Sequence, residues 1–406
     1  MLVGGSLDAD NEAQARVLRA YLYMRLVDLY GNVKIITEPG VNSPQVSSDQ
    51  VFDFIEAEIL SALGVSEITA GLNVSGSALG TDPTRFKVNQ FAALGILSKL
   101  YLNAEVWKGE AMYDKAAIAS QYIIDNGGYT LCDDATCVVE NLGKRPEVDS
   151  DPAELSGYAA VFAPNNFDNP EHIFSVYYNE AAAGGMNFSQ MNLHYSSQFT
   201  WNLDAQPWNG YATIEDFYNS YEDGDARKAN NFVVGPQLDF SGSAVLDFAS
   251  DDEDIQLNYT PAINELEPNH RREAGARPAK FSFKQFGRPD MDNDYPIIRL
   301  GQVHLIHAEA VARDGGDWNL ALTDVNMLRT RANVSTYASI DEDEFLAERG
   351  REMFQESSRR TDLIRFGRYN DAWWEKPASQ PFVNVFPIPQ EQIMAAGDLT
   401  QNPGYN

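Results

Sequence analysis

Residues 295–333 constrain the fold more than any other segment, because they contain two apolar runs separated by a pair of glycines. Apolar side chains recur at helical spacing before the turn, at Ile298, Val303, Leu305, Ile306, Ala308, Ala310 and Val311. Gly315 and Gly316 end that run. The spacing then resumes at Ala321, Leu322, Val325 and Leu328. This period is typical of an α-helix, so we expect helices over 298–313 and 319–332, joined by a tight turn.

Three further helix pairs follow from the same pattern. We expect helices over 8–30 and 48–63, over 85–106 and 112–126, and over 341–357 with a short helix near 369–375. Small residues such as Ala92, Ala93, Ala116 and Ala117 let two helices approach closely, as they do in tetratricopeptide repeats. The chain has no strict 34-residue period. We therefore predict a mostly α fold with a tetratricopeptide-like scaffold of helix pairs.

The pattern changes between residues 127 and 294, where Asn, Asp, Gly, Ser and Pro become dense. We expect a strand over 173–178 and a short helix beginning near Phe217. Loops on a rigid helical body often carry binding residues. We predict one domain with four parts: helix pairs over 1–126, a loop-rich ligand-binding region over 127–294, further helix pairs over 295–376, and an extended segment over 377–406.

The acidic composition limits the partners that this chain can have. It contains 59 acidic and 30 basic residues, a formal net charge of −29. Nucleic acids and anionic lipids are also polyanions, so we expect neither as a partner. Solubility alone can explain such a surface. No run of about 18 apolar residues predicts a membrane span, and the opening MLVGG matches neither a signal peptide nor a lipoprotein cysteine.

The two cysteines lie close together, as Cys132 and Cys137 in LCDDATC. A disulfide closing this small loop fits an oxidising compartment. Free thiols are the alternative. A metal site has little support, because Asp133 and Asp134 are adjacent but no histidine is.

Catalytic signatures are missing from the sequence. It contains no Gly-x-Ser-x-Gly elbow, no P-loop and no His-Glu-x-x-His motif. His304 and His307 share a helix, and their apolar surroundings favour packing over metal binding. A glycosidase needs two carboxylates across a cleft. The acids Glu352, Glu356 and Asp362 alternate with arginines, which indicates structural ion pairs, so we expect no enzyme.

Aromatic residues offer the better indication of function. Sugar rings stack their C–H faces on flat aromatic side chains, while amides hold the hydroxyl groups. The segment 186–221 combines many aromatic and amide residues in a Gly- and Pro-rich context. Phe217, Tyr218 and Tyr221 have helical spacing and should pack inward. The remaining candidates for sugar binding are Tyr195, Trp201, Trp208, Asn209 and Tyr211.

Acidic clusters raise the question of calcium. Glu222, Asp223 and Asp225 form one cluster, and residues 251–254 form another, DDED. Neither has the twelve-residue EF-hand spacing. We therefore expect no cofactor, with calcium as the weaker alternative.

Six ordered motifs across nearly the whole chain resemble the SusD/RagB family. They are residues 295–333, residues 16–39 (RVLRAYLYMRLVDLYGNVKIITEP), residues 85–101, residues 169–176 (NPEHIFSV), residues 349–367 (RGREMFQESSRRTDLIRFG) and residues 386–405 (FPIPQEQIMAAGDLTQNPGY). Lys34 departs from the family's usual proline. Members normally carry a signal, a lipidated cysteine and about a hundred or more residues before the helix at 8–30, so the resemblance implies a missing N-terminal portion.

The resemblance implies a function as well as a fold. Family members are glycan-binding lipoproteins of the outer membrane of Bacteroidota, beside a SusC-like TonB-dependent transporter. By this resemblance Tyr211, which follows Asn209-Gly210, and Phe188, which follows Gly184-Gly185, would stack on sugar. We expect cell-surface capture of a poly- or oligosaccharide, with a neutral glucan such as the marine β-glucan laminarin preferred. The alternatives are a glycoside hydrolase, and a peptide-binding or structural partner of the transporter.

Overall fold

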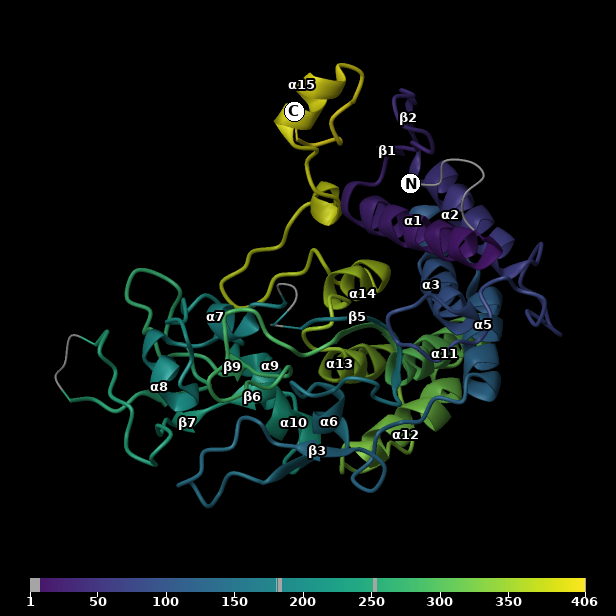
Figure 1. The fold of residues 1–406 in the computed structure, drawn as a ribbon. Helices are drawn as coiled ribbons and strands as arrows, with labels where there is room; N and C mark the ends of the chain where they lie inside the picture. Colours follow the sequence, from purple (N-terminus) through teal and green to yellow (C-terminus); the bar gives the residue numbers. More distant parts are fainter. Residues whose placement is uncertain (1–7, 180, 182–184, 251–253, 406) are drawn as a thin grey trace.

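The computed structural model describes residues 8–405 except residue 180 and residues 182–184 and 251–253. Six main helices form a stack on one side of the molecule (Figure 1). In chain order they are α1 (Ala9–Tyr30), α2 (Ser48–Leu63), α3 (Gln90–Leu102), α5 (Tyr113–Asn126), α11 (Leu300–Gly315) and α12 (Leu322–Arg331). Each packs on the next, so α5 and α11 are neighbours although the loop-rich region separates them in sequence. This confirms the predicted helical scaffold.

Local sequence signals set the ends of these helices. The Asp8 side chain caps α1 by accepting from the backbone N–H of Asn11 (2.8 Å), and Asn89 caps α3 in the same way through Ala92. Gly316 ends α11 in the left-handed conformation, with φ of 67°. The predicted turn at Gly315-Gly316 is therefore confirmed.

Three expected helices differ from the structure. Residues 295–299 form strand β10 (Tyr295–Arg299) before α11 begins, and the first turns of the helix expected over 85–106 are irregular up to Asn89. No helix occupies 369–375, which forms turns, so that prediction was wrong. The partner of α13 (Glu342–Glu352) is instead α14 (Arg359–Arg365). Sequence reading missed α14 because its inward side chains are charged, not apolar.

The loop-rich region contains short elements and two-stranded antiparallel sheets. Its helices are α6 (Tyr158–Val161), α7 (Phe188–Asn192), α8 (Gln198–Trp201), α9 (Glu215–Asn219) and α10 (Ala226–Asn231), with a 3-10 turn, η1, at Tyr195–Ser197. Its strands are β3 (Val138–Glu140), β4 (Glu154–Ser156), β5 (His172–Val176), β6 (Phe232–Val233), β7 (Gly235–Pro236), β8 (Asn258–Tyr259) and β9 (Arg277–Pro278). Strand β5 lies where a strand was expected over 173–178.

Strand β5 fixes the loop-rich region to the helical scaffold. It pairs with β10, with Val176 opposite Tyr295 and His172 opposite Arg299. Helix α3 packs against this pair, and its Gly95 allows the approach. A Cβ at that position would lie 2.7 Å from Cγ2 of Ile298. This contact lies within the main core, and Tyr295 at the start of β10 packs against a second core around Phe162, Phe281 and the cysteines.

The remaining elements are short and lie at the edges of the scaffold. They are β1 (Val33–Lys34), β2 (Gln45–Val46), α4 (Ala104–Trp107), η2 (Trp318–Ala321), η3 (Pro381–Asn384) and α15 (Gln390–Ala396). The C-terminal segment runs back to the first hairpin (Figure 1). There the Thr400 N–H donates to Gln45 (2.9 Å), and Asn402 donates to the carbonyl of Tyr30 (3.0 Å).

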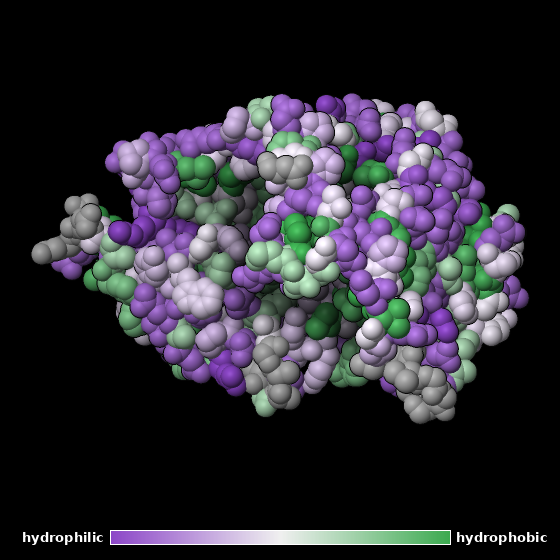
Figure 2. Space-filling view, turned by 90° about the horizontal axis from the view of Figure 1, so that it is seen from above, coloured by the Kyte–Doolittle hydropathy of each residue, from purple (hydrophilic) through white to green (hydrophobic). Residues whose placement is uncertain are grey.

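Seen from above, the surface of the molecule is irregular, and hydrophobic and hydrophilic residues are mixed over it (Figure 2). Hydrophobic groups form separate patches among polar ones, and a hollow opens on the left, over the loop-rich region. None of the helices in the described part of the chain has the length and apolar character that a bilayer crossing requires.

Candidate glycan-binding site

Trp208 and Tyr211 form an exposed pair of aromatic rings on a loop that is fixed to α7. Their side chains are 55% and 54% exposed. The Trp208 N–H donates to the carbonyl of Gln190 (2.6 Å), and the Tyr211 N–H donates to the carbonyl of Met191 (2.8 Å). We call Trp208 and Tyr211 the aromatic platform. Exposed rings on a pinned backbone suit stacking, because little freedom is lost when a ligand binds.

The dipeptide between the two rings explains how the loop holds them. Asn209 adopts a left-handed conformation with φ of 56°, which asparagine tolerates better than most residues. Its N–H donates to the carbonyl of Leu193 (3.0 Å). A Cβ at Gly210 would lie 3.0 Å from the carbonyl oxygen of Met191. Asn209-Gly210 therefore lets the loop press against α7 while both aromatic side chains point away.

The other predicted aromatic residues are half-buried. Trp201 packs edge-on against Phe283, with ring centroids 5.2 Å apart, and Phe188 packs against Phe281 at 5.6 Å. Tyr195 lies beside the ring of His194 at 5.1 Å. Each has a packing role, so their part in sugar binding stays a prediction. Gly184, half of the glycine pair before Phe188, lies outside the described residues.

Trp201 also lines a large cleft of about 670 Å³ between the β3–β4 hairpin and α10. Tyr218 lies on its wall, with the Lys228 ammonium 4.5 Å from the ring centroid. Amide groups of Asn141, Asn230 and Gln237 complete the polar part of the lining. The structure therefore separates Trp201 from the exposed platform and places it among groups that suit a polar ligand.

Sequence analysis did not single out a second pair of exposed rings, Phe199 and Phe248. They are 51% and 55% exposed and meet edge to face, with centroids 6.3 Å apart. Phe248 comes from an acidic, Ser-rich stretch with no periodicity that predicts where it points. In contrast, Phe217, Tyr218 and Tyr221 pack inward as predicted, around Phe232.

The acids considered for catalysis are buried in ion pairs. Arg299 lies 2.9 Å from Glu352 and 2.6 Å from Glu356, all with almost no exposed surface. Arg349 and Arg365 flank Asp362 at 2.9 and 2.8 Å. Burial would raise the pKa of Glu352, but Arg331 and Arg299 outweigh it and hold that pKa well below its usual value. These carboxylates are locked in their charged form away from solvent, which confirms the ion-pair interpretation.

The same network links the two parts of the fold. Arg227 of α10 lies 2.6 Å from Glu348 of α13. Burial alone would raise the pKa of Glu348, but the charges of Arg227 and Arg351 outweigh it and lower that pKa to about 2. Arg329 and Arg331 of α12 also join it, through Glu348 and Glu171. Charges that seemed out of place on packing helices thus hold the loop-rich region on the scaffold.

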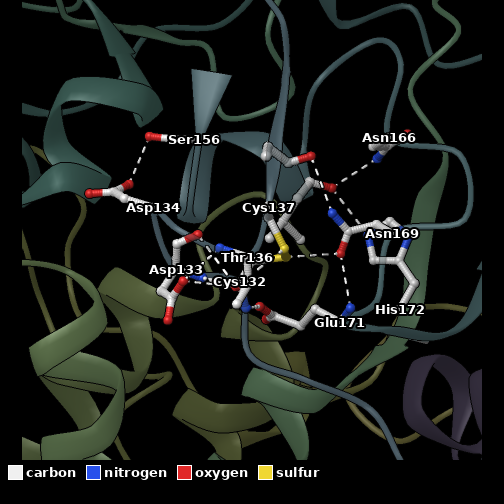
Figure 3. The surroundings of a disulfide bond; sticks show 12 residues. Cys132, Asp133, Asp134, Thr136, Cys137, Ser156, Asn166, Asn169, Glu171 and His172 are labelled. Carbon is white, nitrogen blue, oxygen red and sulfur yellow. Dashed lines mark hydrogen bonds between the residues drawn. A yellow bond between two sulfur atoms is a disulfide. The ribbon is translucent and has the colours of Figure 1, made fainter. Parts of the chain in front are cut away.

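Cys132 and Cys137 form a disulfide beside this network (Figure 3). The Cys132 N–H donates to Glu171 (3.1 Å), and Asn169 accepts from the N–H of Glu171 (3.0 Å). Asp133 accepts from Thr136 within the small loop (2.8 Å). The preferred pairing of the cysteines is confirmed, and the free-thiol and metal alternatives do not describe this structure.

The residues considered for metals are engaged with other groups. His304 and His307 both contact Asp324 through Nδ1, each at 2.7 Å. Glu222 pairs with Arg329, and Asp225 with Arg227. Asp251, Asp252 and Glu253 lie outside the described residues. Across the part of the chain that is described, no three His, Cys, Asp or Glu side chains are placed to hold a metal ion.

Comparison with known proteins shows which family the chain resembles. Residues 267–405 match the model of the SusD family. The starch-binding protein SusD of Bacteroides thetaiotaomicron is 37% identical over 124 residues, covering 28% of this chain and 22% of that protein. A SusD-like protein of Bacteroides ovatus is 24% identical over 386 residues, 88% of this chain and 59% of that one. The chain thus aligns with less than two thirds of the length of either relative.

Solved structures share the fold. A SusD superfamily protein from Parabacteroides distasonis superposes with a TM-score of 0.72 at 19% identity, covering 99% of this chain and 80% of that one. A laminarin-binding SusD-like protein gives 0.68 at 20% identity, with coverage of 99% and 80%. The match over residues 267–405 and the two curated relatives therefore show a likeness to the SusD/RagB family, and the solved SusD-like structures share the fold over nearly the whole chain.

Proposed function

We propose that this chain is a non-catalytic, cell-surface glycan-binding protein that captures a poly- or oligosaccharide on the aromatic platform. The observation that carries the proposal is the pair of rings of Trp208 and Tyr211, exposed and held by backbone bonds to α7. Aromatic side chains that are large, rigid and exposed on a soluble protein commonly mark a binding surface.

The preferred ligand is a neutral glucan. A net charge of −29 disfavours polyanions, and stacking requires only the apolar face of a sugar ring. One relative is named a starch-binding protein and one structural neighbour a laminarin-binding protein, both of which support a glucan. Laminarin is therefore our first choice of probe.

The absence of catalysis is also part of the proposal. The carboxylates that sequence inspection selected are neutralised by arginines and removed from solvent. A retaining or inverting hydrolase needs one carboxyl group that exchanges a proton with the sugar. Delivery to a SusC-like TonB-dependent transporter, with lipid anchoring of the full-length protein in the outer membrane, completes the proposed role.

Native affinity electrophoresis through gels containing laminarin, starch or a charged polysaccharide tests this function. We expect retardation in a neutral glucan gel, and its loss in Trp208→Ala and Tyr211→Ala. Phe386→Ala is the matched control, because Phe386 is 41% exposed and its N–H donates to the carbonyl of Leu29 in α1, on the helical scaffold. Equal retardation of the platform variants and the control would refute the site, and shortening of the glycan would refute the non-catalytic role.

A further inference from the structure

A small cavity at the junction of α1, α3, β10 and α14 has four cations and three carboxylates in its lining, and the buried Glu309 behind it pairs with Arg365. It has a volume of about 120 Å³ and is lined by the cations Arg25, Lys99, Arg349 and Arg365 and the carboxylates Asp28, Glu356 and Asp362. We call it the Lys99 cavity. It lies far below the usual size of a small-molecule site, so only a small ion or a few waters fit.

Each carboxylate in the lining already has a partner. Asp28 accepts from Arg360 (3.0 Å) and Thr361 (3.2 Å). Asp362 accepts from Arg365 (2.8 Å). The remaining carboxylate, Glu356, is held by the buried Arg299 at 2.6 Å. Each of the three carboxylates therefore already contacts an arginine, and none of them forms an ion pair with Lys99.

Lys99 is the cation that lacks a counter-charge. Its ammonium donates only to the carbonyl of Ile297 at 3.4 Å, and it makes no ion pair with any described residue. Burial, followed by repulsion from Arg25 and Arg349, lowers the pKa of Lys99 to about 8, because together these effects outweigh the attraction of Asp362 and Glu356. An ammonium can donate three hydrogen bonds, so this group has capacity left for an acceptor.

Two more donors on the cavity wall are unused. Arg349 is 3% exposed, and its Nη1 has no hydrogen-bond partner within the described residues. Ser358 is 8% exposed, and its Oγ is likewise without a partner in that set. Buried polar groups are nearly always hydrogen-bonded in folded proteins. Unused donors beside an unbalanced lysine indicate that an acceptor with negative charge belongs between them.

We propose that the Lys99 cavity binds a small monovalent anion, of acetate or halide size, between Lys99, Arg349 and Ser358. An anion there would satisfy the free donors and offset the repulsion among the cations. It would also tie α1 and α3 to the turn before α14. The site is independent of the proposed glycan function, because none of these residues belongs to the aromatic platform.

Thermal unfolding in increasing sodium acetate or sodium bromide tests the site, with ionic strength held constant by gluconate, which is too bulky for the cavity. We expect a saturable rise in the midpoint of about 2 °C once the anion is tenfold above its Kd. Lys99→Met should abolish this rise. Lys115→Met is the control, because it removes the same charge from a lysine on α5 that lies 3.7 Å from Glu56, and it should keep the rise.

Crystals of the wild-type protein soaked in bromide give a second measurement that does not depend on a folded variant. An anomalous peak beside the Lys99 ammonium is the expected result. Absence of bromide from the cavity would overturn the proposal. So would an unfolding midpoint that responds to neither anion, or one that rises equally in Lys99→Met and wild type.

Discussion

Arg299 and Glu171 form a buried ion pair that connects β10 to the residue preceding β5, with Nη1 of Arg299 2.8 Å from Oε1 of Glu171. Neither side chain has measurable exposure. The same guanidinium reaches Glu352 and Glu356. Arg299 therefore contacts three carboxylates at the joint between the helical scaffold and the loop-rich region, and Arg331 and Lys280 help to neutralise them.

Replacing Arg299 with methionine should strongly destabilise the protein. The change leaves the buried Glu356 without its main counter-charge and removes one partner from Glu171 and Glu352, which typically costs about 3–5 kcal/mol. We expect the free energy of unfolding, measured with urea, to fall by that amount. Arg368→Met is the control, since its pair with Asp343 is exposed to solvent and should contribute little to stability. Comparable losses in the two variants would contradict a central role for Arg299.

Asp294 should make the folded protein less stable as the pH rises through 6. Burial raises the pKa of Asp294 to about 6, although a hydrogen bond from the N–H of Tyr178 lowers it in part. The folded state therefore holds this proton over a range in which the unfolded state, with a carboxyl pKa near 3.9, has released it. The contribution of Asp294 to the free energy of unfolding is therefore fully present below about pH 4 and is lost as the pH rises from about 4 to 6.

Asp294→Asn should remove that loss. We expect the variant to exceed wild type in free energy of unfolding by about 1–3 kcal/mol at pH 8, and the gain to vanish near pH 4. Chemical denaturation at both pH values measures the difference. A gain of equal size at both would show that ionisation of Asp294 is not its cause.

The disulfide should stabilise the fold modestly. Cys132 and Cys137 are five residues apart, and closing so short a loop restricts the unfolded chain by about 2 kcal/mol. Unfolding of a Cys132→Ala, Cys137→Ala double variant should show a loss of that order. Adding a reductant should lower the stability of wild type but leave the double variant unchanged. A loss far above this range would indicate that the bond also supports Glu171.

The conformation of Asn209 should govern the aromatic platform. Asn209→Gly keeps the left-handed backbone accessible, so glycan retardation should survive. Asn209→Val places a β-branched side chain at φ of 56°, at a cost of about 1–2 kcal/mol. We expect this variant to fold with lower stability and to bind glycan more weakly. Identical binding by both variants would show that the loop does not set the geometry of Trp208 and Tyr211.

Sequence patterns predicted the long helices well and the charged ones poorly. Residues 48–63 have clear apolar spacing, and helix α2 covers the same range. Helix α14 was missed because the side chains that it buries, Asp362 among them, are charged and face arginines from distant segments. No local pattern distinguishes such a helix from a solvent-exposed one.

The candidate site shows the same limit. A loop without periodicity gives no information about which rings face the solvent, so residue spacing did not distinguish Trp201, Trp208 and Tyr211. Only contacts from elsewhere in the chain separate them, because Phe283 covers part of Trp201 while α7 holds the backbone around Trp208 from behind.

The sequence by itself determined the helical scaffold, the turn at Gly315-Gly316, the family resemblance and the pairing of acids with arginines. These depend on residue types at short spacing, where helix periodicity and turn preferences act. Tertiary structure alone decided which charge meets which, that Lys99 forms no ion pair with a described residue, and that Trp208 and Tyr211 stand exposed. Those outcomes depend on long-range packing, which brings together side chains that are far apart in the chain.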